Sequence, residues 1–209
     1  MNICAYMNIK NVIFDFGQVI VYFKEKFMVD KYVDNKEDSS LLSEVIFDRL
    51  YWDRLDLGTI TNEEVVSECK KRLPSRLHDL VDTIYYNWIY NIPLIEGMED
   101  LLLFLKKRGV KIYLLSNISR YLVSNQDKFP IFDLFDGKVF SSELGIVKPD
   151  HRIFKHICDK YSLVPSETIF VDDNINNVNS GKDFGLITYQ FDGDASKLKS
   201  YLTDIMNLK

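Results

Sequence analysis

The sequence predicts an α/β fold, in which a parallel sheet is flanked by crossover helices and interrupted by an inserted block of helices. From residue 93 onward, short apolar runs with strand character alternate with amphipathic segments, as in consecutive βαβ units. One more apolar run, at 12–14, stands near the start of the chain. Residues 22–92 show helical spacing alone. We therefore predict a core domain formed by residues 1–21 and 93–209, with an α-helical domain inserted at 22–92.

The composition is ordinary for a soluble globular protein. The chain has 209 residues, of which 46% are hydrophobic and 27% are charged. Its net charge of -5 argues against a nucleic-acid-binding protein, because such proteins usually carry a basic face. No apolar run approaches the roughly 20 residues that cross a membrane, so we expect no membrane partner. No pattern in the sequence indicates an oligomeric state.

Two features predict a cytoplasmic protein with reduced thiols. Residues 1–7 carry neither a positive segment nor an apolar run long enough for a signal peptide. Cys4, Cys69 and Cys158 are odd in number, far apart and free of any CxxC pattern. Thiols of this kind are usually unpaired in a reducing compartment.

The first apolar run leads directly to a candidate functional residue. Val12, Ile13 and Phe14 are β-branched or aromatic, as expected for a strand buried on both faces of a parallel sheet. Asp15 follows, at the strand end where ligands bind in open α/β sheets. Burying its carboxylate is costly unless it is paired or bound to metal. From this stretch alone, a helix cap or a solvated turn explains Asp15 equally well.

The inserted block is predicted to contain about four helices. One helix is expected to start near Ser39-Ser40 and another at Thr61, where Glu64 three residues later completes a capping box. The break at Pro74 precedes a further helix. None of these segments shows the spacing of a strand.

The second half alternates between helices and strands. We predict helices over 98–108, 151–161, 175–184 and 194–209, and strands over 110–115, 138–140, 168–171 and 186–191. Gly109 and Gly185 close two of the helices, and Pro149 precedes a third. The segment 121–129 is helical or irregular.

Polar residues follow four of the predicted strands: Asp15, Ser116-Asn117, Lys148 and Asp172-Asp173. The carboxyl ends of parallel strands meet at one edge, so these groups should share one crevice. Clustered carboxylates repel each other unless a cation lies between them, and hard oxygen ligands with substrate phosphate favour Mg²⁺. A hydroxyl, a lysine and backbone N–H groups suit a phosphate. Each residue alone has a structural explanation, such as a helix cap or a surface lysine.

These residues resemble the motifs of the haloacid dehalogenase superfamily, and the resemblance covers nearly the whole chain. The four motifs of that family, in order, look like Phe14–Val19, Leu114–Asn117, Val147–Asp150 and Phe170–Asn174. The helical block after the first motif is similar to the α-helical cap found in one large subgroup. The resemblance implies a Rossmann-like parallel sheet with such a cap.

Finer features resemble the branch that contains α-D-glucose-1-phosphate phosphatase. They are Ser116–Arg120, Glu143–Pro149, and in the cap Trp52 and the segment Gly58–Thr61. We expect Trp52 to line the substrate pocket, with packing in the cap core as the alternative. The resemblance implies a phosphatase that hydrolyses a small phosphorylated metabolite, in particular a sugar phosphate.

The resemblance also implies a role for each motif residue. Asp15 is the expected nucleophile, which would form an aspartyl-phosphate. Ser116 and the N–H of Asn117 would bind the transferring phosphoryl group, and Lys148 would offset its charge and that of Asp15.

A Mg²⁺ cofactor is implied as well, because a carboxylate and a phosphate repel each other. Its expected ligands are Asp15, the carbonyl of Gly17, and Asp173. Asp172 would be a further ligand or a neighbour that orients one.

Gly17 departs from the family pattern. Most phosphatases of the superfamily have a second Asp at this position, which protonates the leaving oxygen. One possibility is that the substrate has an acidic leaving group, such as a sugar 1-phosphate, and simple alkyl esters such as 6-phosphates react slowly. The other is that a cap residue such as Asp53 or Arg54 supplies the proton, or that Gln18 orders a water. Ester type would then matter little.

Two further functions remain open. One is a catalytically weak protein that binds a phosphorylated ligand or a partner. The other is a metal-free dehalogenase in which Asp15 attacks carbon, although the acidic pair Asp172-Asp173 argues against it.

Overall fold

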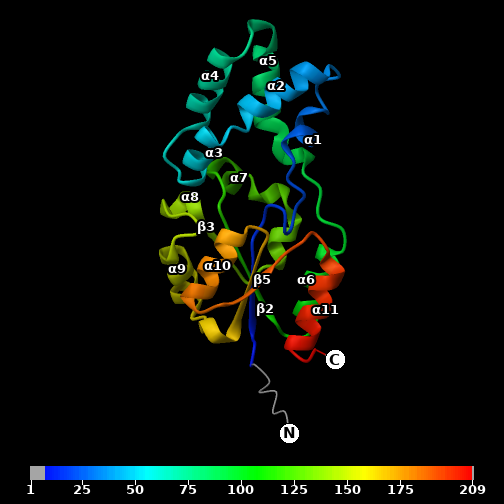
Figure 1. The fold of residues 1–209 in the computed structure, drawn as a ribbon, viewed down its shortest axis with the longest axis vertical. Coiled ribbons are helices and arrows are strands. Elements are labelled where there is room, and N and C mark those ends of the chain that lie inside the picture. The colour runs from blue at the N-terminus through cyan, green and yellow to red at the C-terminus, as the bar shows by residue number, and fades with distance from the viewer. Residues whose placement is uncertain (1–7, 209) are drawn as a thin grey trace.

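The computed structural model describes residues 8–208, and its core is a five-stranded parallel sheet with the order β3-β2-β1-β4-β5 (Figure 1). The strands are β1 (Asn11–Phe14), β2 (Lys111–Ser116), β3 (Gly137–Phe140), β4 (Thr168–Asp172) and β5 (Ile187–Gln190). Residues 1–7, including Cys4, lie outside the described part of the chain. The predicted fold class is confirmed.

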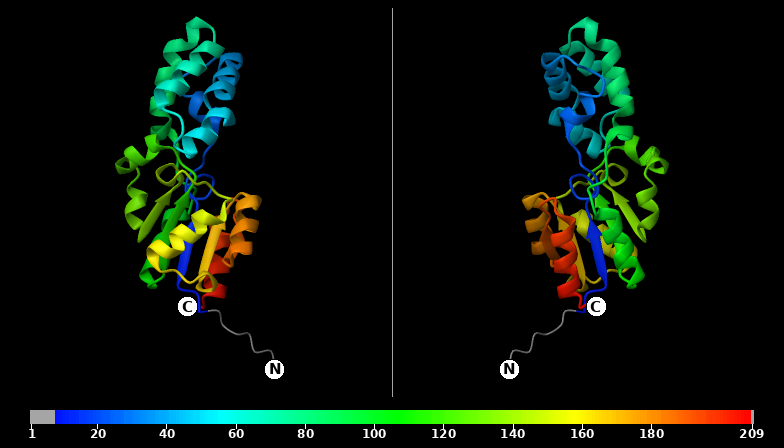
Figure 2. Two further views of the ribbon diagram at one scale, coloured as in Figure 1. Left: turned by 90° about the vertical axis from the view of Figure 1, so that its left-hand side faces the viewer. Right: turned by 90° about the vertical axis from the view of Figure 1, so that its right-hand side faces the viewer.

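Helices cover both faces of the sheet (Figure 2). Val12 and Phe14 pack with α6 (Met98–Lys107) and α11 (Ala195–Ile205) in the larger hydrophobic cluster. Ile13 points to the opposite face and packs in a second cluster with α9 (His151–Tyr161). α10 (Ile175–Phe184) adjoins α9 and contributes Phe184 to that cluster. Successive strand residues face opposite sides, so a strand covered on both faces must be apolar throughout.

The site lies where the strand order reverses. β1 pairs with β2 on one side and with β4 on the other, both in parallel. The chain builds β1, β2 and β3 in one direction, then crosses back to add β4 and β5 beyond β1. This reversal leaves a crevice beyond the carboxyl ends of β1 and β4, which is where open α/β sheets bind ligands.

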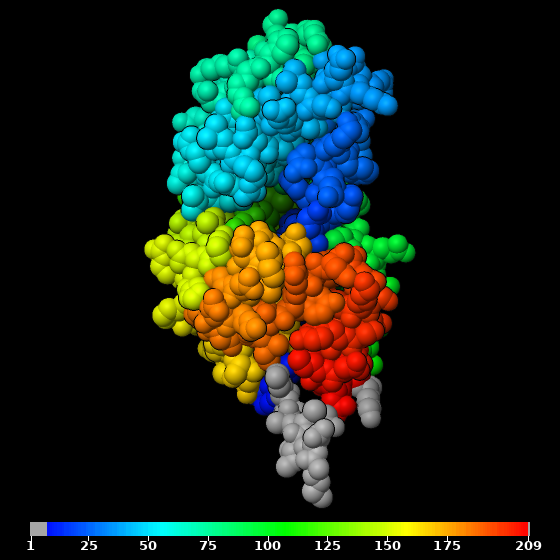
Figure 3. Space-filling view, in the orientation of Figure 1, coloured from blue at the N-terminus to red at the C-terminus, as the bar shows by residue number. Residues whose placement is uncertain are grey.

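The segment between β1 and α6 forms a helical cap above this crevice (Figures 1 and 3). Its helices are α1 (Glu25–Val29), α2 (Lys36–Ile46), α3 (Arg49–Asp56), α4 (Asn62–Arg72) and α5 (His78–Asn87), with short 3₁₀ turns at Ser75–Leu77 and Trp88–Asn91. The expectation of about four helices missed α1. That helix has five residues and is too short to show a full amphipathic period.

One predicted helix start was wrong and another is confirmed. Helix α2 begins after Asn35, whose side chain accepts hydrogen bonds from the N–H groups of Glu37 and Asp38. Ser39 lies inside the helix and donates to Asp30 instead. Thr61 and Glu64 form the predicted capping box at the start of α4.

The remaining elements are short or close to prediction. The segment 121–129 overlaps α7 (Arg120–Ser124) and contains a 3₁₀ turn at Gln126–Lys128. Helix α8 (Ser141–Leu144) follows β3. Further 3₁₀ turns occupy Pro130–Leu134 and Pro165–Glu167. The terminal helix α11 places Tyr201 against Tyr189 of the edge strand, with ring centroids 4.7 Å apart.

Two chain segments connect the core to the cap, and they pair with each other. Val21 and Leu94 form an antiparallel bridge. The N–H of Tyr22 donates to the carbonyl of Pro93 at 2.8 Å, and that of Ile95 to Ile20 at 2.9 Å. The cap therefore enters and leaves the core at one paired joint.

Two further expectations can be compared with the described residues. Cys69 and Cys158 are unpaired and buried, and burial raises the pKa of each thiol to about 11, which makes both poor nucleophiles. Among residues 8–208, no helix is long and apolar enough to cross a membrane.

Candidate active site

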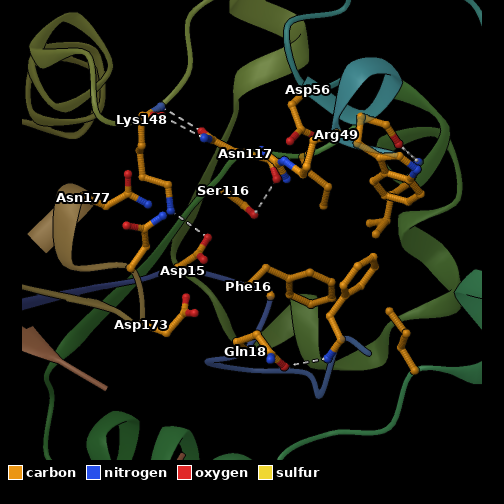
Figure 4. Close-up of a pocket in the computed structure, with 18 of the residues that line it drawn as sticks. Asp15, Phe16, Gln18, Arg49, Asp56, Ser116, Asn117, Lys148, Asp173 and Asn177 are labelled. Carbon is orange, nitrogen blue, oxygen red and sulfur yellow. Dashed lines mark hydrogen bonds and ion pairs between the residues drawn. The ribbon is translucent and has the colours of Figure 1, made fainter. Parts of the chain in front are cut away.

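A pocket of about 220 Å³ lies between the cap and the carboxyl ends of the strands (Figure 4). The core lines it with the predicted residues Asp15, Gly17, Ser116, Asn117, Lys148 and Asp173. The cap contributes Arg49, Trp52, Asp56 and Trp88. The structure thus brings the residues from three strand ends and the Lys148 loop together in one place.

Asp15 and Lys148 form the centre of the site. The N–H of Asp15 donates to the carbonyl of Val171 at 2.9 Å, which continues the β1–β4 ladder and holds Asp15 at the strand end. The Lys148 ammonium, almost fully buried, lies 2.7 Å from Oδ1 of Asp15 and 2.7 Å from Oδ2 of Asp172. One cation therefore bridges two carboxylates from neighbouring strands.

The electrostatics of this cluster favour additional positive charge. Burial would lower the pKa of Lys148, but Asp15 and Asp172 outweigh it and hold that pKa above its usual value. Burial raises the pKa of Asp15 despite the opposing contact with Lys148, and Asp172 raises it further. Lys148 is therefore charged, and a single lysine does not fully offset the carboxylates around it.

The acidic cluster fits a divalent cation. Asp15, Asp172 and Asp173 each offer a carboxylate oxygen, and these oxygens lie within 4.8 Å of one another. Asp173 is half-buried, and burial followed by the charge of Asp172 raises its pKa. Within residues 8–208 it forms no ion pair with a lysine or arginine. A hard cation with oxygen ligands suits such a cluster.

Asp172 differs from Asp173 because its oxygens are already occupied. Lys148 already contacts Oδ2 of Asp172. The N–H of Asn174 donates to Oδ1 of Asp172 at 2.9 Å, and the side-chain amide nitrogen of Asn177 lies 3.1 Å from both carboxylate oxygens. Asn177 lies in the first turn of α10, close behind the acidic pair. The sequence reasoning missed its role in holding Asp172.

Asn117 orients the lysine loop. Its side chain accepts a hydrogen bond of 2.8 Å from the N–H of Lys148 and donates one of 2.9 Å to the Lys148 carbonyl. The backbone of Lys148 therefore occupies both the oxygen and the nitrogen of the Asn117 side chain. The backbone N–H of Asn117 is the group that can bind a ligand. Ser116, at the end of β2, is buried beside it and lines the pocket.

A tight loop follows Asp15. The N–H of Gln18 donates to the carbonyl of Val21 at 2.7 Å, and Gln18 has a positive φ of 58°. The Gln18 side chain accepts a hydrogen bond of 2.9 Å from the Phe23 N–H. A Cβ on Gly17 would meet no atom within 4 Å, so the space where a second acid could stand is open.

Trp52 lies in the pocket wall. Its indole N–H donates to the carbonyl of Ile46 at 2.8 Å. Its ring stacks on Phe47, with centroids 5.2 Å apart, and contacts Trp88 edge-on at 5.3 Å. Trp52 therefore packs in the cap core and also lines the pocket, so both alternatives expected for it apply.

The cap acid in the pocket is Asp56, which the sequence reasoning missed. Asp53 is exposed and pairs with Arg49, and Arg54 borders a separate surface hollow near Glu64. Asp56 is four residues after Trp52 and therefore lies on the same face of α3. Once Trp52 is placed in the pocket, this spacing selects Asp56.

Comparison with known proteins identifies the family of the chain. A family model described as haloacid dehalogenase-like hydrolase matches residues 9–185. The chain is 27% identical to a D-ribitol-5-phosphate phosphatase of Bacteroides thetaiotaomicron, over 95% of this chain and 99% of that relative. It is also 27% identical to a sesquiterpene phosphatase of Aspergillus oryzae, over 85% of this chain and 87% of the relative.

Solved structures share the fold. A haloacid dehalogenase family enzyme of Bacteroides thetaiotaomicron, in complex with magnesium and inorganic phosphate, has a TM-score of 0.69 and 24% identity, over 91% of this chain and 98% of that one. L-2-haloacid dehalogenase of Xanthobacter autotrophicus has a TM-score of 0.62 and 18% identity, over 93% and 87% of the two chains. Because the family model spans most of the sequence, this chain belongs to the haloacid dehalogenase-like hydrolases.

Proposed function

We propose that this hydrolase is a Mg²⁺-dependent phosphatase of small sugar or polyol phosphates, acting through an aspartyl-phosphate on Asp15. The observation that carries the proposal is the cluster of Asp15, Asp172 and Asp173 with oxygens within 4.8 Å, set beneath a pocket that also holds Lys148. A metal-free dehalogenase has no use for this crowding of carboxylates.

Each core residue has a task in the proposed reaction. Asp15 attacks the phosphorus atom in line with the leaving oxygen, and water later hydrolyses the acyl phosphate. Lys148 holds Asp15 in position at 2.7 Å and offsets the charge that gathers between carboxylate and phosphoryl group. Ser116 and the Asn117 N–H donate to the phosphoryl oxygens.

The metal would be held by Asp15, Asp173 and the carbonyl of Gly17, where its charge would reduce the repulsion between carboxylate and phosphate. Asp172 is the outer partner in this proposal, because its oxygens are bonded to Lys148, Asn174 and Asn177. It therefore fixes the lysine and shapes the acidic cluster.

Pocket size supports a small substrate. The pocket volume is about 220 Å³. A phosphoryl group and a short polyol or one sugar ring match this scale, whereas a long terpene chain exceeds it. Arg49, Asp56 and Asn174 at the wall can bond hydroxyl groups. The ribitol-5-phosphate phosphatase relative favours the polyol or sugar class over the narrower 1-phosphate expectation.

The test is phosphate release from a panel of ribitol 5-phosphate, glucose 1-phosphate, glucose 6-phosphate and farnesyl phosphate, with Mg²⁺ and with a chelator. We expect turnover of at least one of the three polyol or sugar esters with Mg²⁺, none with the chelator, and little with farnesyl phosphate. A parallel assay follows halide release from 2-chloropropionate. Metal-independent halide release would assign a dehalogenase, and tight phosphate binding without turnover would assign a binding protein.

A further inference from the structure

Asp56 is the acidic side chain that the cap contributes to the pocket within residues 8–208. It ends helix α3, it is 7% exposed, and it lines the same cavity as Asp15, Ser116 and Lys148. In Figure 4 it extends from the cap side of the pocket, while Asp15 comes from the sheet side. A substrate bound through its phosphoryl group at Asp15 would place the rest of the molecule toward the cap.

Core groups hold Asp56 in this position. Its carbonyl accepts a hydrogen bond of 2.6 Å from the hydroxyl of Ser141, at the start of α8. Two residues later, the backbone of Gly58 lies so close to the core that a Cβ would stand 2.5 Å from the Ser142 carbonyl. These two contacts, one at Asp56 and one at Gly58, fix the end of α3 relative to the core.

We propose that Asp56 donates the proton to the leaving oxygen of the substrate, the task for which Gly17 has no side chain. This proposal rests on the phosphatase function proposed above. It assigns a catalytic residue to the cap, at the wall that faces the leaving group. Phosphate esters of ordinary alcohols then become competent substrates despite the glycine.

Asp56 loses one proton in the first half-reaction and regains one in the second. As Asp15 forms its bond to phosphorus, the ester P–O bond breaks, its electron pair stays on the leaving oxygen, and that oxygen takes the proton of the Asp56 carboxyl. The products are the free alcohol, phosphorylated Asp15 and an Asp56 carboxylate. The carboxylate then takes a proton from the water that attacks phosphorus, which releases phosphate and restores both aspartates.

The charge environment of Asp56 suits a group that exchanges a proton near neutral pH. Burial is the largest influence and raises its pKa to about 7. Asp53 and Asp15 raise it further, whereas Arg49 and Lys148 oppose the shift. General acids and bases work best when their pKa lies near the working pH.

The experiment compares kcat/KM for ribitol 5-phosphate, whose leaving alkoxide needs a proton, with p-nitrophenyl phosphate, whose phenolate does not. Asp56→Asn should lose about 10²–10⁴-fold on the alkyl ester and far less on the aryl ester. Glu44→Gln, at an exposed acid of cap helix α2 outside the pocket lining, is the control and should resemble the parent with both. Asp56→Glu should recover part of the alkyl activity. Thermal melting checks that each variant folds.

Equal loss on both esters, or no loss on either, overturns the assignment of Asp56. If Asp56→Asn does not fold, the parent still decides: alkyl turnover should fall above a pH of about 7 while aryl turnover holds, and parallel profiles contradict the proposal. If the parent hydrolyses neither these esters nor any ester of the panel with Mg²⁺, the phosphatase function itself fails. That outcome differs from a failure confined to the Asp56 variant.

Discussion

The buried hydroxyl of Ser141 donates a hydrogen bond of 2.6 Å to the carbonyl of Asp56 and accepts one of 2.9 Å from the N–H of Ile118. Ile118 lies two residues after Ser116, in the loop that would bind the phosphoryl group. A single core side chain thus joins the end of cap helix α3 to that loop. The position of the cap and the geometry of the site are therefore coupled through local contacts.

Gly58→Ala should disturb the contact between the end of α3 and the core more than Gly109→Ala does. Gly58 has a φ of +69°, and a Cβ there would stand 2.5 Å from the Ser142 carbonyl. Gly109 has a similar φ of +76° but nothing within 4 Å of its Cβ position, so Gly109→Ala reports the backbone strain alone. We expect the Gly58 variant to lose about 1–3 kcal/mol more stability, as for an overpacked site, and to lose activity as well.

Urea unfolding and kcat/KM on an alkyl phosphate measure both effects. Equal losses of stability and activity in the two variants would show that the close approach of Gly58 to the core does not position the cap.

Gly17→Asp should restore alkyl-ester hydrolysis in the Asp56→Asn background. The Cβ position at Gly17 is open, and its φ is outside the left-handed region, so the new side chain fits without strain. A carboxyl there can protonate the leaving oxygen from the core side and replace the missing cap acid. The readout is the ratio of alkyl to aryl kcat/KM, with Gly17→Asn as the control that lacks an acid. A ratio unchanged from Asp56→Asn alone would refute the replacement.

The ionisation of Asp56 should also appear in stability. Its pKa is 3.8 for an ordinary Asp and about 7 in the folded protein. Between these values the folded carboxyl keeps its proton and the unfolded one has lost it. The free energy of unfolding therefore falls as pH rises, by up to about 1.4 kcal/mol per pH unit.

Urea unfolding in the presence of a chelator, at several pH values from about 4 to 8, should show Asp56→Asn gaining stability relative to the parent as pH rises. The comparison between the two proteins cancels the titration that other carboxyls contribute to both. Parallel curves would mean that the carboxyl of Asp56 is not buried as the structure places it.

The core was predictable because its elements repeat strong local patterns. Helices at 151–161 and 175–184 have the expected bounds, since apolar spacing, a cap residue and, for the second, a closing glycine agree. Parallel strands end at the same edge, which predicted that Asp15 would share a crevice with Asp172 and Asp173. The pairing of β1 with β4 brings these residues together.

The cap was less predictable because a helix pattern does not show which face meets another domain. Leu50 in α3 is apolar but 63% exposed, whereas Asp56 is polar and buried. No local pattern in the sequence marks Asp56 as a buried acid at the contact between cap and core until Trp52 has been placed in the pocket. Asn117 bonds Lys148, which is distant in the sequence, and the role of Asn177 depends on how the Asp172 carboxylate is oriented. Residue spacing reveals neither.

The most direct test of the central claim is to acid-quench the protein during turnover with Mg²⁺ and locate the phosphoryl group by peptide mass spectrometry. The nucleophile assignment predicts a gain of one phosphoryl group on the peptide that contains Asp15, with no gain when the metal is chelated. Asp15→Asn should show no adduct and well under about a hundredth of the parent kcat/KM, because its amide cannot form an acyl phosphate. Phosphorylation at another residue, or an Asp15→Asn variant that turns over at a rate near the parent's, would contradict the account.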